Sequence, residues 1–147
     1  MKQAIVIDLD GTLCDSKHRE HFARNREWNK FHSKLIEDEP NPDVCWFVQH
    51  LVKHANDISI IALTGRNEAF RNLTYDWLQK YNFPFDQVIM RPEGDFRPDH
   101  VLKIEMLKAH CHQTGLQILF VLDDRDKVVE EWRNSGYKCW QVRPGGY

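Results

Sequence analysis

The sequence predicts an α/β domain built around a parallel β-sheet. Short runs rich in Ile, Val and Leu alternate along the chain with longer segments in which apolar residues recur at helical spacing. Turn-forming residues, such as Pro40 and Pro42, separate these segments. At 147 residues the chain is long enough to bury a core, and we expect one domain over residues 1–147.

Each predicted strand is a short apolar stretch bounded by polar or turn-forming residues. Five stretches share this pattern: residues 3–9, 58–63, 87–90, 117–122 and 138–142. The second is followed by Thr64-Gly65-Arg66-Asn67, which we interpret as a polar turn.

The predicted helices lie between the strands. They cover about residues 43–53, the stretch from Phe70 to Leu78, a segment that begins near Asp99, and about residues 126–135. Asp43 is expected to cap the first of them, and Gly136 to end the last. Residues 15–39 are polar and aromatic and form a small insert, in which we expect Phe22, Trp28 and Phe31 to pack rather than to stack on a base. All five tryptophans are expected in the core.

Composition restricts the class of protein. A net charge of −2 argues against a large non-specific nucleic-acid surface, although a small basic pocket for a terminal phosphate is compatible with it. No apolar run reaches membrane-spanning length, and the N-terminus leads directly into a strand. We therefore expect a cytoplasmic protein without a membrane partner. The four cysteines are scattered and are expected to be free thiols.

The first strand ends in Asp8-Leu-Asp10-Gly11-Thr12, which places two carboxylates two residues apart. Adjacent negative charges at a strand end are costly unless a cation or a proton neutralises them. A divalent metal facing a phosphoryl group explains the pattern, with one aspartate attacking phosphorus and the other transferring a proton. Taken alone, the motif is equally compatible with an ordinary loop.

Two further strands end in polar clusters, Thr64-Gly65-Arg66 and Asp123-Asp124. The carboxyl ends of parallel strands meet at one edge of the sheet, where open α/β folds bind their ligands. Clustered carboxylates beside a hydroxyl and cationic side chains suit an oxygen-ligated Mg²⁺ site that handles phosphate. We therefore expect Mg²⁺ as the cofactor.

The order of these motifs resembles that of the haloacid-dehalogenase-like (HAD) phosphohydrolases along the whole chain. Asp8-x-Asp10-Gly-Thr-Leu is similar to their first motif, Thr64 to the second, Lys103 to the third and Asp123-Asp124 to the fourth. The resemblance implies a Rossmann-like sheet in the order 5-4-1-2-3, counting the five strands along the chain, with helices on both faces and a short insert after strand 1.

The resemblance also implies roles for these residues. Asp8 would be the nucleophile and Asp10 the acid and base, while Thr64 would bind a phosphoryl oxygen and Lys103 would offset negative charge. The metal would take a carboxylate oxygen of Asp8, the backbone carbonyl of Asp10 and a carboxylate of the Asp123-Asp124 pair, with Asp124 as the expected direct ligand.

The C-terminal third, Asp123 to Val142, resembles the end of the 3′-phosphatase module of bacteriophage polynucleotide kinase-phosphatase. In that family an arginine follows the second aspartate by nine residues, as Arg19 does here, and another follows a Ser-Gly pair, as Arg66 follows Thr64-Gly65. The resemblance implies that Arg19, Gly65, Arg66 and Asp99 belong to the substrate site. Asp99 would pair with Lys103 or an arginine, and Arg19 is expected to be a surface residue of the pocket whose loss costs little stability.

The resemblance implies a phosphatase that removes a 3′-phosphate from DNA or RNA ends. The chain lacks a Gly-x-x-x-x-Gly-Lys-Ser/Thr loop, so we expect no kinase module in it. A 5′- or 3′-nucleotidase of the same superfamily is the first alternative. A receiver-like domain that stores an aspartyl-phosphate is the second, but Asp10 would have no task there.

Overall fold

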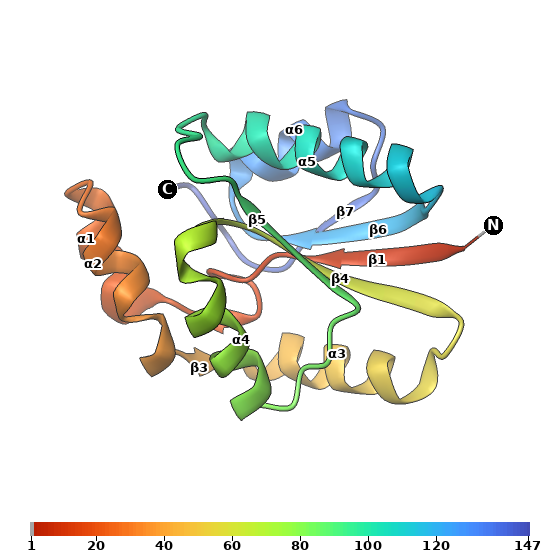
Figure 1. The fold of residues 1–147 in the computed structure, drawn as a ribbon, viewed down its shortest axis with the longest axis horizontal. Coiled ribbons are helices and arrows are strands. Elements are labelled where there is room, and N and C mark those ends of the chain that lie inside the picture. Colours follow the sequence, from red (N-terminus) through yellow and green to blue (C-terminus); the bar gives the residue numbers. More distant parts are fainter. Residues whose placement is uncertain (1) are drawn as a thin grey trace.

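A computed structural model describes residues 2–147 of the chain. Five parallel strands form one twisted sheet in the order β5-β4-β1-β6-β7 (Figure 1). The strands are β1 (Gln3–Ile7), β4 (Ile58–Asn67), β5 (Gln87–Arg91), β6 (Gln117–Asp123) and β7 (Cys139–Gln141). Counted without the insert, this is the predicted strand order.

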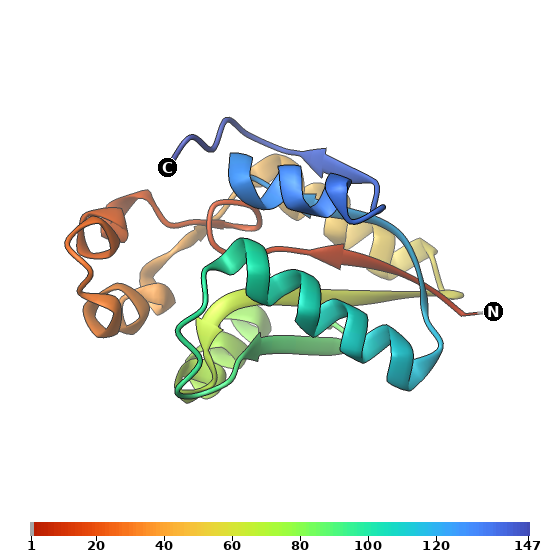
Figure 2. The same cartoon turned by 90° about the horizontal axis from the view of Figure 1, so that it is seen from above.

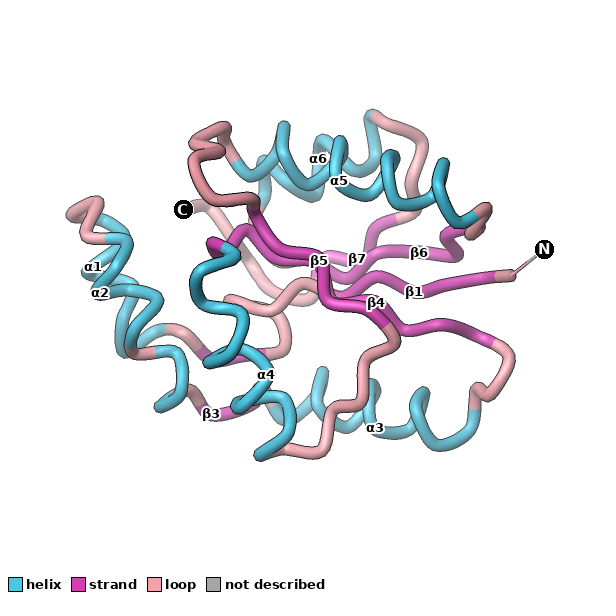
Figure 3. The backbone as a smooth tube through the Cα atoms, viewed as in Figure 1, coloured by secondary structure: helices cyan, strands magenta, loops and turns pink. Residues whose placement is uncertain are grey.

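Helices cover both faces of the sheet, as expected (Figures 1 and 3). They are α3 (Pro42–His54) and α4 (Arg71–Lys80) on one face, and α5 (Asp99–Thr114) and α6 (Asp126–Asn134) on the other. Because side chains alternate along a strand, β1 serves both layers. Ile5 and Ile7 join the core that includes Trp77 of α4, whereas Ala4 and Val6 join the core that includes Trp132 of α6.

The insert lies at the edge of the sheet where the strands end (Figures 1 and 2). It contains a two-stranded antiparallel pair, β2 (Cys14–Asp15) and β3 (Glu39–Pro40), and between them η1 (Lys17–Arg19), α1 (Glu20–Arg24), α2 (Trp28–Ser33) and η2 (Leu35–Glu37). The C-terminal end of the chain reaches the same edge. The insert and the chain end therefore surround the point at which β1, β4 and β6 terminate.

Two local predictions were wrong. Residues 64–67 are not a turn: β4 continues to Asn67, which pairs with Arg91 of β5 beyond an irregularity in the register. Helix α3 begins at Pro42, one residue before Asp43, because proline suits the first helical position. The helix predicted from Phe70 to Leu78 is confirmed as α4, which a 3-10 turn, η3 (Glu68–Phe70), precedes.

The tryptophans divide between core and surface. Trp77 and Trp132 are fully buried, as predicted, but three others are not: Trp28, Trp46 and Trp140 are 54%, 61% and 52% exposed. In the insert, Phe31 is buried, as expected. No helix in the described part of the chain is both long and apolar enough to span a bilayer.

Candidate active site

A pocket of about 690 Å³ opens at the carboxyl edge of the sheet. Its lining includes six residues that the sequence singled out: Asp8, Asp10, Thr64, Gly65, Asp99 and Lys103. The insert contributes one wall, the loop before α5 another, and Tyr147 near the chain end a third. The pocket therefore combines elements that are distant in the sequence.

Asp8 lies in the buried, acidic half of the pocket. Lys103 Nζ donates to Asp8 Oδ1 at 2.8 Å and to Asp123 Oδ2 at 3.1 Å. Oxygen atoms of Asp8, Asp123 and Asp124 lie within 4.8 Å of one another. Burial, followed by the charge of Asp123, raises the pKa of Asp8 well above its ordinary value, while Lys103 acts in the opposite direction.

Neighbouring donors hold the two aspartates after β6 in different ways. Both oxygens of Asp123 accept protein hydrogen bonds, Oδ1 from the Asp124 amide at 2.9 Å and Oδ2 from Trp132 Nε1 at 3.2 Å. Among the described residues, the Asp124 carboxylate accepts only from hydroxyl groups, at 3.3 Å from Thr12 Oγ1 and also from Tyr147. Thr12 Oγ1 also lies 2.9 Å from Asp8 Oδ2. Asp124 is thus the member of the pair with fewer competing donors.

Asp10 lies in the other half of the pocket, among arginines. Arg66 Nη2 donates to Asp10 Oδ1 at 2.7 Å, and Arg19 donates to the same oxygen. Behind Asp10, Arg19 Nε and Nη2 donate to the two oxygens of Asp38 at 2.8 and 2.6 Å. Burial opposes ionisation of Asp10, but the charges of Arg19 and Arg66 outweigh it and hold its pKa far below the ordinary value.

The charges balance in one half and not in the other. The positive charges of Arg19 and Arg66 compensate the negative charges of Asp10 and Asp38, to which they lie within ion-pair distance. Lys103, however, faces three carboxylates, those of Asp8, Asp123 and Asp124. With all three carboxylates ionised, two negative charges are left uncompensated there, and the raised pKa of Asp8 reflects this excess. A divalent cation carries the matching charge, and carboxylates are its preferred ligands. The acidic half fits a divalent metal, whereas the arginine half has no such deficit.

Gly65 and Asp99 form the rim of the pocket. A Cβ at Gly65 would lie 2.5 Å from Asp99 Oδ1, so any larger residue would displace the Asp99 carboxylate. Asp99 pairs with Arg91 and, at 3.0 Å, with Arg125. The expected ion pair of Asp99 is therefore with arginines and not with Lys103. Thr64 is buried beside Gly65, and its hydroxyl accepts from the Arg66 amide at 3.1 Å.

Comparison with known proteins identifies the family of this chain. A family model described as the polynucleotide kinase PNKP phosphatase domain matches residues 2–147. This chain belongs to that HAD phosphatase family.

Individual relatives of this PNKP-family domain are larger proteins. This domain is 30% identical to a chain in a solved Pnkp1/Rnl/Hen1 complex, and the two align with a TM-score of 0.86 over 100% of this chain and 48% of that chain. It is 29% identical over 136 residues to a protein of Autographa californica nuclear polyhedrosis virus described as a bifunctional polynucleotide kinase/RNA ligase, covering 90% of this chain and 18% of that protein. The domain thus spans less than half the length of either relative.

A more distant likeness supports the fold alone. The HAD domain of the effector Lem4 from Legionella pneumophila is 16% identical and aligns with a TM-score of 0.57 over 100% of this chain and 88% of that chain.

One expectation about this PNKP-family domain was wrong. Arg19 is not a surface residue, because its side chain is fully buried between Asp10, Asp38 and the Phe31 carbonyl, which accepts from Nη1 at 3.1 Å. Arg66 is also fully buried. Both guanidinium groups lie behind Asp10 and do not form the surface of the pocket.

Sequence reasoning assigned no role in the PNKP-family site to two residues of the insert that the structure places there. Asp38 holds the arginine pair, and His32 lines the pocket although it is only 8% exposed. Both belong to the insert, where no strand end or motif marks them. The one available signal was the unusual density of charged and aromatic residues between positions 15 and 39.

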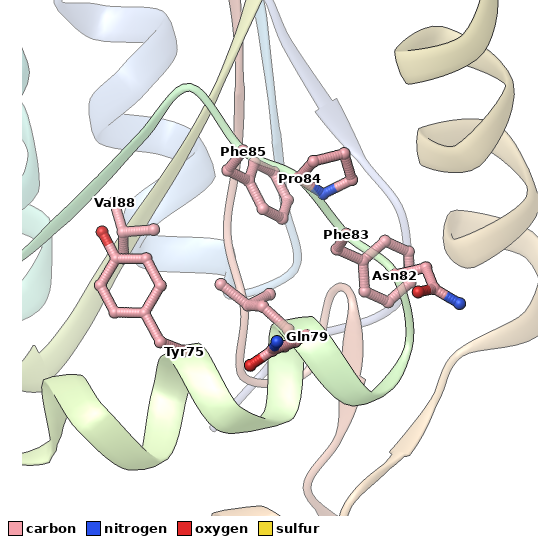
Figure 4. A pocket seen from close by; sticks show the side chains of 8 residues that line it. Tyr75, Gln79, Asn82, Phe83, Pro84, Phe85 and Val88 are labelled. Carbon is pink, nitrogen blue, oxygen red and sulfur yellow. The ribbon is translucent and has the colours of Figure 1, made fainter.

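A second pocket, of about 410 Å³, lies between α4 and the chain entering β5 (Figure 4). Its lining is mainly apolar and contains no charged side chain: Tyr75, Leu78, Gln79, Asn82, Phe83, Pro84, Phe85 and Val88. It shares no residue with the first pocket and offers no group suited to phosphate chemistry.

Proposed function

We propose that this domain is a Mg²⁺-dependent phosphomonoesterase that removes 3′-phosphates from polynucleotide ends through an aspartyl-phosphate. The observation that carries the proposal is the division of the pocket. Asp8 lies in a half that lacks two positive charges, and Asp10 lies in a half whose charges balance. Nucleophile and proton-transfer group thus have separate environments, as two carboxylates with two roles require.

The acidic half would hold the reacting phosphate. Asp8 and Asp124 would bind Mg²⁺ through their side chains and Asp10 through its backbone carbonyl, while Asp123 would support the site through its hydrogen bonds to Lys103 and Trp132. When bound, the ion offsets the repulsion between the attacking carboxylate and the phosphate. Lys103 would reduce the same repulsion, and the Thr64 hydroxyl would bind a phosphoryl oxygen.

The reaction then needs Asp10 to donate a proton in the first step and to accept one in the second. An oxygen of Asp8 attacks phosphorus, the bond from phosphorus to the 3′-oxygen breaks, and Asp10 donates a proton to that oxygen. In the second step Asp10 takes a proton from water as the water oxygen attacks phosphorus. Inorganic phosphate leaves, and the Asp8 carboxylate is restored.

Asp10 is ionised in the free site because of its two arginines. The proton for the first step would therefore be taken up when the substrate binds, from the solvent or with the phosphate monoester itself, which has a second pKa of about 6 and carries one proton below it. The negative charge of the bound phosphate would oppose the two arginines and raise the pKa of Asp10, so that Asp10 can hold the proton that the leaving oxygen needs.

The relatives favour a polynucleotide as the substrate. One is described as a polynucleotide kinase/RNA ligase, and another belongs to a Pnkp1/Rnl/Hen1 assembly described as an RNA repair complex. We propose that this domain likewise acts on phosphorylated ends during nucleic-acid repair.

Phosphate release in the presence of Mg²⁺ tests the proposal. The substrates are a 3′-phosphorylated oligonucleotide, its 5′-phosphorylated isomer, and deoxynucleoside 3′- and 5′-monophosphates, with Asp8→Asn as the inactive control. We expect rapid release from the 3′-phosphorylated strand alone. Preference for mononucleotides would replace the proposal with a nucleotidase, and release from no substrate would refute the phosphatase assignment.

A further inference from the structure

His32 is a buried polar side chain for which the part of the chain described by the structure supplies no partner. It lies on α2 in the insert and is only 8% exposed, yet it lines the active-site pocket. Its Nδ1 is fully buried without a hydrogen bond, whereas Nε2 is not among the fully buried atoms, so Nε2 is the ring nitrogen that a ligand in the pocket can reach. Neither ring nitrogen bonds to another of the described residues. Buried polar groups are almost always paired, so an orphan in an active-site wall requires an explanation.

The surroundings keep the ring uncharged. Phe70 and Phe31 lie 5.0 and 5.2 Å from the ring centroid of His32, and the Trp28 ring lies 6.5 Å away, roughly parallel to it. Burial lowers the pKa of His32 to about 4. A neutral imidazole has one donor and one acceptor nitrogen. A hydroxyl group can donate or accept and so can pair with either nitrogen, whereas a phosphate dianion only accepts and can pair with the donor nitrogen alone.

The position of His32 is on the leaving-group side of the pocket. The carbonyl of the preceding residue, Phe31, accepts from Arg19, whose guanidinium group also bonds to Asp10. Asp10 is the residue that we propose donates a proton to the 3′-oxygen. The group beside Asp10 is therefore the sugar of the terminal nucleotide rather than the phosphoryl group, which faces Asp8 and Lys103.

We infer that His32 recognises the ribose 2′-hydroxyl of the terminal nucleotide and so favours RNA ends over DNA ends. The 2′-hydroxyl is attached to the carbon next to the one that bears the leaving oxygen, and it is the group by which proteins distinguish RNA from DNA. The apolar rings around His32 suit the carbon face of a sugar. This inference rests on the proposed function and adds a substrate class to it.

The test compares two substrates that differ in one atom. One is an RNA strand with a 3′-phosphate, and the other is the same strand with a 2′-deoxy sugar at the terminal nucleotide only. One net hydrogen bond corresponds to a preference in kcat/KM of about 3- to 10-fold for the ribose end. His32→Phe retains an aromatic ring and removes both nitrogens, so we expect the ratio to fall to about 1. We expect His32→Gln, which retains a donor and an acceptor, to restore part of it.

His21→Phe is the matched control, because His21 is exposed in the same insert and is not part of the pocket lining. We expect this variant to keep the wild-type ratio. Unfolding curves of each variant establish that the fold is intact. Loss of packing lowers both rates together, whereas loss of the hydrogen bond lowers only the rate on the ribose end.

Two results would overturn the inference: a wild-type enzyme without preference between the two strands, or a preference that survives in His32→Phe. The failure of the proposed function is a separate result. If neither strand is hydrolysed but mononucleotides are, the polynucleotide assignment fails, and the ratio for ribonucleoside and deoxyribonucleoside 3′-monophosphates then decides the role of His32.

Discussion

Replacement of Arg19 by alanine is expected to cost the fold several kcal/mol. The Arg19 guanidinium group is fully buried and donates to Asp38 at 2.8 and 2.6 Å, to Asp10, and to the Phe31 carbonyl at 3.1 Å. Removing one member of a buried ion pair costs about 3–5 kcal/mol, mainly because the remaining charge stays buried without its partner. Asp38 would retain only His18 at 2.6 Å and Arg66 at 3.9 Å.

Urea unfolding at pH 7, followed by tryptophan fluorescence, measures this cost. For a chain of this length, such a loss lowers the melting temperature by roughly 10 °C. Arg24→Ala is the control, since Arg24 is an exposed arginine of the same insert, and we expect a change below about 0.5 kcal/mol.

A double variant separates the buried charge from the lost packing. In Arg19→Met/Asp38→Leu, both members of the pair become apolar, and we expect most of the lost stability to return, because no unpaired charge remains. A loss below about 1 kcal/mol in Arg19→Ala would refute the argument, as would a double variant less stable than Arg19→Ala.

Four further predictions concern the site. Asp8→Asn is expected to abolish phosphate release, and turnover at the wild-type rate would refute the role of Asp8 as the nucleophile. In metal-free protein the same substitution is expected to raise the melting temperature, because it relieves repulsion among three carboxylates. Because Asp10 is ionised in the free site, the reaction has to take up one proton with a substrate whose second pKa is about 6. We therefore expect kcat/KM to fall about tenfold per pH unit above about pH 6, and a flat profile up to pH 8 would contradict this. Because the pKa of His32 is lower in the folded protein, the unfolded chain takes up a proton first as the pH falls from about 6.5 to 4. This linkage is expected to lower the free energy of unfolding of the wild type by about 3 kcal/mol more than that of His32→Phe, and equal losses in the two proteins would contradict it. Gly65→Ala is expected to raise KM and to cost about 1–3 kcal/mol in urea unfolding, because the added methyl displaces Asp99, and an unchanged KM would argue against that contact.

The sequence was sufficient to predict the sheet and the convergence of its polar strand ends. Apolar runs that end in Asp8, Thr64 and Asp123 are local signals, and parallel topology brings their ends to one edge without further information. Lys103 could be predicted only through the resemblance of the whole set, because a lysine on a helix is ordinarily exposed. In the structure it is almost fully buried against two carboxylates.

Local signals failed where contacts between distant segments decide the structure. Thr64-Gly65-Arg66-Asn67 has the composition of a turn, but pairing of Asn67 with Arg91 keeps the chain extended. The burial of Arg19 depends on Asp38, nineteen residues further along the chain. No spacing rule connects such partners, so sequence alone placed Arg19 on the surface.

The insert is therefore better understood as part of the support of Asp10, the residue that we propose transfers the proton, than as a lid. Its Arg19 bonds to Asp10, and its Asp38 anchors that arginine. The Asp38 carbonyl in turn accepts from Trp77 Nε1 at 2.8 Å, which fixes the end of the insert to a fully buried residue of α4. A movement of the insert would break a buried ion pair and remove one of the two arginines that set the pKa of Asp10. In the proposed reaction, a substrate consequently has to enter through the existing opening of the pocket, with the insert in place.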